Sequence, residues 1–146
     1  MAYFNKEKIS ALCFGIFNSN RWSTCTAYKL TEHFLYADKS ETYWSSRFTE
    51  NGYLFSGDKV NIDDVKFGKV SSLLSLVPLN IFELNLPKNS APGNKDEYTI
   101  FIQVDIKDGK TLQFKVNEYD SRDLEISKNI LAFKDTVKNF IKEIES

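Results

Sequence analysis

Residue types that could act as a nucleophile and its base lie near one another at Ser23, Cys25 and His33, the only histidine of the chain. A catalytic pair needs its reacting atoms within hydrogen-bond reach, about 3 Å. Cys25 and His33 would be roughly 26 Å apart along one strand, or roughly 15–20 Å apart if residues 31–33 turn the chain. We therefore interpret His33 as a solvated turn residue and assign no catalytic residue.

Metal and cofactor sites are not indicated either. One histidine and two cysteines cannot supply the usual four zinc ligands. The acids at 120–125 lack the alternating ligands and glycine of a calcium loop. The acids at 63–64 lie at the start of one expected helix and those at 120–125 just before another, where carboxylates suit the helix N-terminus. No phosphate-binding loop, dinucleotide fingerprint or nucleophile elbow is present. We expect no metal and no cofactor, and an enzyme with an unassigned carboxylate or tyrosine site is the least favoured functional class.

The two cysteines, Cys13 and Cys25, would face each other if residues 18–20 closed a hairpin centred on Ser19. Directly opposed strand residues have Cβ atoms about 4.5–5.5 Å apart, wider than the roughly 3.8 Å typical of a disulfide. We interpret both as small buried thiols in a reducing compartment, with a disulfide between them as the alternative.

Length and charge limit the class of protein. The 146 residues suit one globular domain over 1–146, and 19 basic residues against 20 acidic ones leave a formal net charge of −1. A nucleic-acid-binding protein normally has a basic excess or stripe. The apolar run at 11–17 is too short to span a bilayer, and no small-residue cleavage site follows it. We expect a mature cytoplasmic protein that binds neither nucleic acid nor membrane.

The first half of the chain has the pattern of β-structure. Strands are expected at 9–17, 25–31 and 34–38, and Asn51-Gly52 is a strong hairpin signal. Counting outward from this turn places Glu50 opposite Tyr53, with Phe48 opposite Phe55.

A second hairpin is expected at 97–119, with Asp108-Gly109 at its tip. Residues 99–106 alternate between apolar and mostly polar side chains, which is typical of an antiparallel sheet with one covered face.

Two helices complete the pattern. The first is expected at 61–77, with Asn61 as its N-cap and Pro78 ending it, and a short strand is possible at 79–84. The second is C-terminal, with Ser127 as its cap and lysines opposite an apolar face of Ile130, Phe133, Val137, Phe140, Ile141 and Ile144. We predict an α+β fold: a single domain with a mainly antiparallel sheet and both helices packed on one face. Phe140→Ala is expected to cost about 3–5 kcal/mol.

Aromatic residues and arginines, which often anchor protein interfaces, are dense in the first sixty positions. The hairpin count assigns Trp44, Phe48, Tyr53 and Phe55 to the core. It leaves four candidate binding residues, two on the less-covered sheet face and two at a turn: Tyr43, Arg47, Arg21 and Trp22. Their alternative role is packing under the loop at 87–97 or under a helix.

These observations favour a non-catalytic, small soluble binding protein. The favoured partner is another protein, in an inhibitor or immunity-type role. The alternative is a domain that binds a small apolar ligand in a pocket lined by Phe and Tyr between sheet and helices. The sequence does not specify the partner or the oligomeric state.

Overall fold

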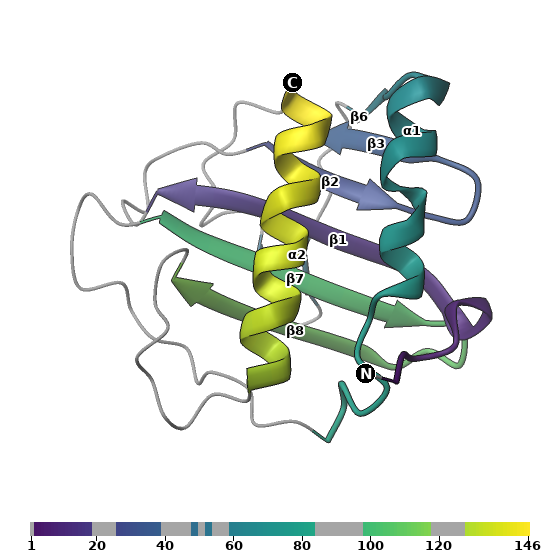
Figure 1. Cartoon of the computed structure of the whole chain (residues 1–146), viewed down its shortest axis with the longest axis vertical. Coiled ribbons are helices and arrows are strands. Elements are labelled where there is room, and N and C mark those ends of the chain that lie inside the picture. Colours follow the sequence, from purple (N-terminus) through teal and green to yellow (C-terminus); the bar gives the residue numbers. More distant parts are fainter. Residues whose placement is uncertain are drawn as a thin grey trace.

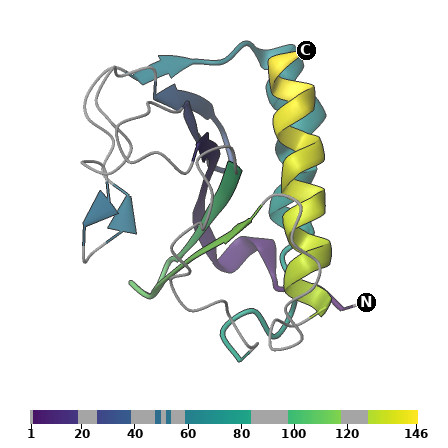
Figure 2. The same cartoon turned by 90° about the vertical axis from the view of Figure 1, so that its left-hand side faces the viewer.

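The computed structural model describes residues 2–18, 26–38, 48–49, 52–53, 59–83, 98–117 and 128–146. Two α-helices lie side by side on one face of a six-stranded antiparallel sheet, and the second helix ends the chain (Figure 1). The view from the side shows the helices on one side of the curved sheet and a small hairpin on the other (Figure 2). The predicted α+β architecture is confirmed.

The sheet is built around its first strand. Its strands are β1 (Ile9–Asn18), β2 (Ala27–Leu30), β3 (Leu35–Asp38), β6 (Lys59–Asn61), β7 (Tyr98–Ile106) and β8 (Thr111–Asn117). Their order is β6-β3-β2-β1-β7-β8, and each neighbouring pair is antiparallel. The first four strands therefore form a meander, and the chain then returns across the helix layer to place β7 beside β1.

The first helical segment is shorter than expected. Helix α1 (Asp64–Val70) begins after Asp63, whose carboxylate accepts the Lys66 N–H at 2.9 Å, and it continues as the 3₁₀ turn η3 (Ser71–Ser75). The expected cap at Asn61 is wrong, because Asn61 is the last residue of β6 and pairs with Tyr36.

The expected strand at 79–84 is also wrong over its described part. Residues 80–83 form turns, in which the Ile81 N–H donates to the Pro78 carbonyl and the Glu83 N–H donates to the Asn80 carbonyl.

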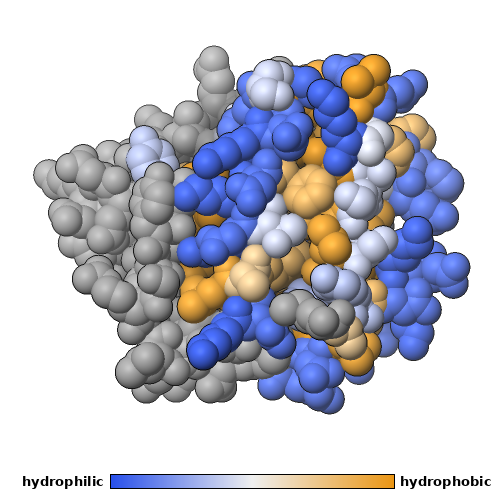
Figure 3. Space-filling model, in the orientation of Figure 1, coloured by the Kyte–Doolittle hydropathy of each residue, from blue (hydrophilic) through white to orange (hydrophobic). Residues whose placement is uncertain are grey.

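Helix α2 (Lys128–Glu145) follows the predicted apolar period. Most of the predicted positions are buried, but Phe140 is only partly buried at the margin of the core, and Ser127 lies outside the described residues. Lys134 breaks the pattern of exposed lysines: it is buried, with Nζ 3.2 Å from the Asp135 carboxylate. The helix side of the molecule shows hydrophilic side chains over α2 and hydrophobic ones in the seam between the helices (Figure 3).

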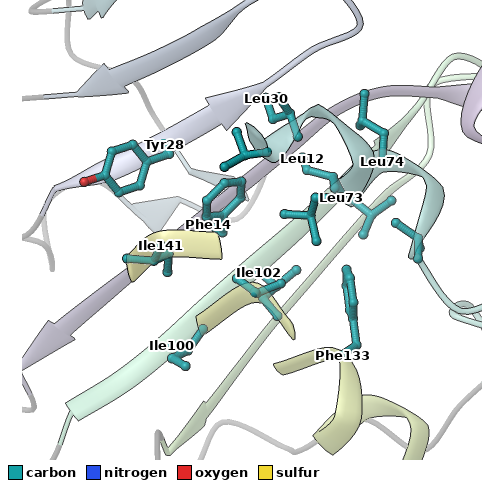
Figure 4. Close-up of a cluster of buried hydrophobic side chains, with 14 of the residues drawn as sticks. Leu12, Phe14, Tyr28, Leu30, Leu73, Leu74, Ile100, Ile102, Phe133 and Ile141 are labelled. Carbon is teal, nitrogen blue, oxygen red and sulfur yellow. The ribbon is translucent and has the colours of Figure 1, made fainter. Parts of the chain in front are cut away.

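The main core fills the layer between sheet and helices. It combines side chains from five strands, from α1 and η3 and from α2, including Leu12, Phe14, Tyr28, Leu30, Leu73, Leu74, Ile100, Ile102, Phe133 and Ile141 (Figure 4). Fully burying one such apolar side chain contributes about 1.5–3 kcal/mol before entropy is counted. Packed side chains occupy this layer, so it gives no support to the expected aromatic-lined ligand pocket there.

Both predicted hairpins are present, although the register of the smaller one differs from the prediction. The β7–β8 turn contains Gly109 at φ 98°, a backbone conformation that favours glycine at the predicted tip. The smaller hairpin, β4 (Phe48–Thr49) and β5 (Gly52–Tyr53), pairs Phe48 with Tyr53. The expected pairing of Glu50 with Tyr53 is therefore wrong. The register of a hairpin depends on how its side chains pack as well as on the conformation that its turn residues prefer.

Candidate binding surface at the β2–β3 turn

The four binding residues predicted from the sequence, Arg21, Trp22, Tyr43 and Arg47, lie outside the described residues. Their role as a binding surface stays a prediction. Tyr53, which the sequence assigned to the core, is buried.

The sheet face turned away from the helices is more covered than expected. Along β7 its side chains Thr99, Phe101 and Gln103 are buried, although the alternating pattern predicted a solvated face. Tyr53 of the small hairpin stacks on Phe101 with ring centroids 5.1 Å apart, and both belong to a second apolar cluster with Cys13, Phe17 and Ala27. The hairpin therefore closes this part of the face.

A polar network fixes the hairpin on the sheet. The Tyr53 hydroxyl donates to the buried Asp38 carboxylate at 2.9 Å, and the Tyr53 backbone N–H donates to Gln103 Oε1 at 2.8 Å. Gln103 in turn donates from Nε2 to Asp105 at 3.1 Å and accepts from Gln113 Nε2 at 3.2 Å. Every buried side-chain nitrogen or oxygen of the described residues has a hydrogen-bond partner. These groups satisfy one another, which is the arrangement of a structural network.

Cys13 lies within this second cluster and is a free, buried thiol. It pairs with Lys29 across β1 and β2, so the expected register that places it opposite Cys25 is wrong; Cys25 itself lies outside the described residues. Burial raises the pKa of the Cys13 thiol to about 12; the Asp105 carboxylate adds to this rise and Lys29 partly opposes it. Because the thiolate is the nucleophilic form, Cys13 is not an activated nucleophile at neutral pH.

The turn between β2 and β3 is short and internally bonded. Thr31 Oγ1 accepts the N–H groups of Phe34 at 3.0 Å and His33 at 3.4 Å, and the Thr31 N–H donates to the Phe34 carbonyl at 2.8 Å. A threonine hydroxyl that bonds the backbone in this way holds a tight turn. His33 is exposed and lies 3.9 Å from Glu32 on the same turn, which confirms it as a solvated turn residue.

Phe34 leaves this turn with 52% of its surface exposed. Its ring lies 5.7 Å from that of Tyr36 and 6.3 Å from that of His33. Beside it is a hollow of about 120 Å³ whose wall includes Phe34 together with His33, Leu35, Asn61, Ile62, Asp64 and Phe67. Leu35 belongs to the main core and Ile62 packs against it, so the base of the hollow is fixed by the fold.

A larger cleft also borders this turn, through Glu32. Its volume is about 580 Å³ and its lining comes from the 3₁₀ turn η1 (Lys6–Lys8), from the β2–β3 turn and from α1 and η3: Lys6, Glu7, Glu32, Phe67, Ser71, Ser72, Leu74 and Ser75. Phe67 is part of the wall of both hollows. We call the exposed turn residues Glu32, His33 and Phe34, together with the smaller hollow, the turn surface.

The sequence contained a weak signal for the turn surface. Phe34 is a large apolar residue directly after the polar segment Thr31–His33, and the strand expected at 34–38 begins with it. Ser71, Ser72 and Ser75 lie within the helix expected at 61–77, and serines at these positions of a helix do not by themselves indicate a cleft.

The described residues contain no group of three or more His, Cys, Asp or Glu side chains arranged to hold a metal ion. Among the helices of the described ranges, none has both the length and the apolar composition needed to cross a membrane. Comparison of the chain with protein-family models, with curated proteins and with solved structures finds no match.

Proposed function

We propose that this chain is a non-catalytic binding protein that recognises another protein through the turn surface. The observation that carries the proposal is the position of Phe34, half exposed beside a hollow with an apolar base. Aromatic residues next to well-packed pockets are typical energetic centres of protein interfaces. The hollow has the size of a single side chain, so a partner could place one apolar group against Phe34 and Phe67.

The rim of the turn surface supports the same function. Glu32 and His33 are exposed on one side of Phe34, and Asp64 lies at the wall of the hollow. An apolar centre with a polar, solvent-accessible rim is the usual anatomy of a protein interface. An inhibitor or immunity-type role needs such a rigid surface and no catalytic group.

The test is affinity capture of the tagged protein from its native lysate, with mass spectrometry. Phe34→Ser removes the aromatic centre, and Tyr98→Ser is the matched control, since Tyr98 is a similarly exposed aromatic residue. Tyr98 pairs with Asn18 at one end of β1, whereas Leu30 before the turn pairs with Leu12, six residues or about 20 Å away along that strand.

We expect wild type and Tyr98→Ser to retain the same stoichiometric partner and Phe34→Ser to lose it. A Tyr43→Ala/Arg47→Ala double variant tests the surface predicted from the sequence in the same experiment. A partner lost only in the double variant would move the function to that surface, and capture of the same partner by all variants would contradict both.

A second candidate function, small-ligand binding, is supported by the 580 Å³ cleft, whose volume falls within the usual range for ligand pockets. This cleft lies at the end of the sheet, and Phe67 is the one aromatic residue of its lining. Its charged residues and serines disfavour the purely apolar ligand expected from the sequence and favour a ligand with polar groups.

A further inference from the structure

The cleft beside the β2–β3 turn contains polar groups that the fold leaves available. Within the described part of the chain, the hydroxyls of Ser72 and Ser75 make no hydrogen bond to protein, while Ser71 Oγ donates to the Gly68 carbonyl of its own helix at 3.4 Å. Lys6 and Glu7 likewise make no ion pair with any described residue. The cleft therefore offers hydroxyls, an ammonium group and carboxylates that can bond a ligand.

Part of the cleft lining is apolar. The Leu74 side chain is buried in the main core, and the Phe67 ring packs against the same core. Both line the cleft together with the serines, and Leu74 directly precedes Ser75 in the sequence. A ligand that fits must combine hydrogen-bonding groups around its edge with an apolar face.

The charges of the lining narrow the class of ligand. Glu7 and Glu32 supply two carboxylates against the single ammonium group of Lys6. A phosphate or carboxylate ligand would meet a net negative lining, whereas proteins that bind phosphate surround it with cations or backbone N–H groups. A cationic ligand would be attracted by the two carboxylates and repelled by Lys6, so the charges partly offset one another. A neutral ligand that both donates and accepts hydrogen bonds can use the carboxylates, the ammonium group and the serine hydroxyls together.

We propose that this cleft binds a neutral carbohydrate of one or two sugar rings, a proposal that rests on the second candidate function. The sugar hydroxyls bond Ser72, Ser75, Glu7 and Glu32, and the C–H face of a ring packs on Phe67.

The experiment is a titration followed by ¹H–¹⁵N NMR of the full chain. The probes are glucose, galactose, mannose, N-acetylglucosamine, lactose and maltose, with glucose 6-phosphate and arginine amide as charged comparisons. We expect at least one neutral sugar to cause saturable shifts at 6–7, 32 and 71–75. Ser72→Ala/Ser75→Ala should weaken that binding roughly tenfold or more, since each lost hydrogen bond removes a factor of several.

Thr136→Ala is the control variant, because the Thr136 hydroxyl bonds the Ala132 carbonyl on α2 and takes no part in the cleft. It should leave sugar binding unchanged. Saturable binding of arginine amide or glucose 6-phosphate, without binding of any neutral sugar, would overturn the carbohydrate assignment but keep the cleft as a ligand site. Absence of shifts at the cleft with every probe would overturn both the carbohydrate assignment and the second candidate function.

Discussion

Aromatic and polar side chains are buried and bonded to one another on the two faces of the sheet, but they are exposed at the turn at its end. On the helix face, apolar side chains bury one another, and on the other face Tyr53, Asp38 and Gln103 satisfy one another through short hydrogen bonds. At the turn, Phe34 is half exposed, and the neighbouring cleft contains serine hydroxyls that the described protein leaves unbonded.

This difference separates groups that maintain the fold from groups available to a partner. On both faces of the sheet the buried side chains described above pack against or hydrogen-bond one another, so substitutions of these side chains should change stability. At the β2–β3 turn, the Phe34 ring and the serine hydroxyls of the cleft lie at the surface. Substitutions of these residues should therefore change binding and leave stability nearly unaltered. The following predictions run from the largest expected effect on stability to the smallest.

Phe133→Ala should cause the largest loss, about 3–5 kcal/mol of unfolding free energy, because its buried ring fills the layer between α2 and the sheet. Phe140→Ala is the matched substitution on the same helix. Since Phe140 is only partly buried, its loss should be smaller than the value expected from the sequence. Urea titration of both variants measures the difference, and an equal or larger loss at Phe140 would contradict the described packing of α2.

Gly15→Ala should cost about 1–3 kcal/mol through overpacking. A Cβ atom at position 15 would lie 2.8 Å from the Phe101 ring and 2.9 Å from the Thr26 carbonyl oxygen, which belongs to the backbone. Gly68→Ala is the control, because a Cβ there has no neighbour within 4 Å and alanine favours the helix by about 1 kcal/mol. Thermal unfolding should lower the midpoint for the first variant and raise it for the second; a neutral Gly15→Ala would show that Phe101 does not cross β1 closely.

Tyr53→Phe should cost about 1–2 kcal/mol, because the variant keeps the ring on Phe101 but removes the hydroxyl that donates to the buried Asp38 carboxylate. Tyr98→Phe removes a hydroxyl from an exposed ring and should change stability little. Guanidinium titrations of the two variants test whether the hairpin side of the sheet is held by its polar network. Identical midpoints for the two would argue against that network.

Alkaline pH should weaken the folded state through Cys13. Its pKa is about 12 in the folded protein against 9.0 for an ordinary thiol, so the unfolded chain loses its proton first. The stabilisation is complete below pH 9 and is lost as the pH rises toward 12. Cys13→Ala should therefore lose less of its neutral-pH stability than wild type between these values. Parallel pH profiles of the two proteins would refute the buried, protonated thiol.

Phe34→Ser should have the smallest effect, within about 0.5 kcal/mol, because much of the ring already faces water. Urea titration beside wild type measures it. A loss above 2 kcal/mol would show that Phe34 is a packing residue, and the turn surface would then lose its role.

Much of the fold follows from local patterns in the sequence. The period-2 alternation in β7 and the apolar stripe of α2 each indicate which face of the element packs on the core. The Asp108-Gly109 pair indicates a turn, because glycine readily adopts the positive φ that the turn requires. The register of β1 with β2 could not be derived from a hairpin expected at Ser19, because the pairing depends on residues from both strands and on β7 beside them.

The covered second face and the turn surface depend on contacts between distant residues. Asp38, Tyr53 and Gln103 come from three separate segments, and no local pattern indicates that they meet. The cleft likewise joins η1, the β2–β3 turn and η3, so its lining is visible only in three dimensions. The sequence could identify Phe34 and the serines as residues, but it could not place them beside a hollow.

The most direct test of the central claim is photocrosslinking from the turn surface in cells. Phe34→p-benzoylphenylalanine places a light-activated aromatic group at the proposed centre, and Tyr98→p-benzoylphenylalanine places the same group at the opposite end of the sheet. We predict one dominant crosslinked protein from position 34 and none from position 98. No crosslink from position 34, or the same product from both positions, would contradict recognition through the turn surface.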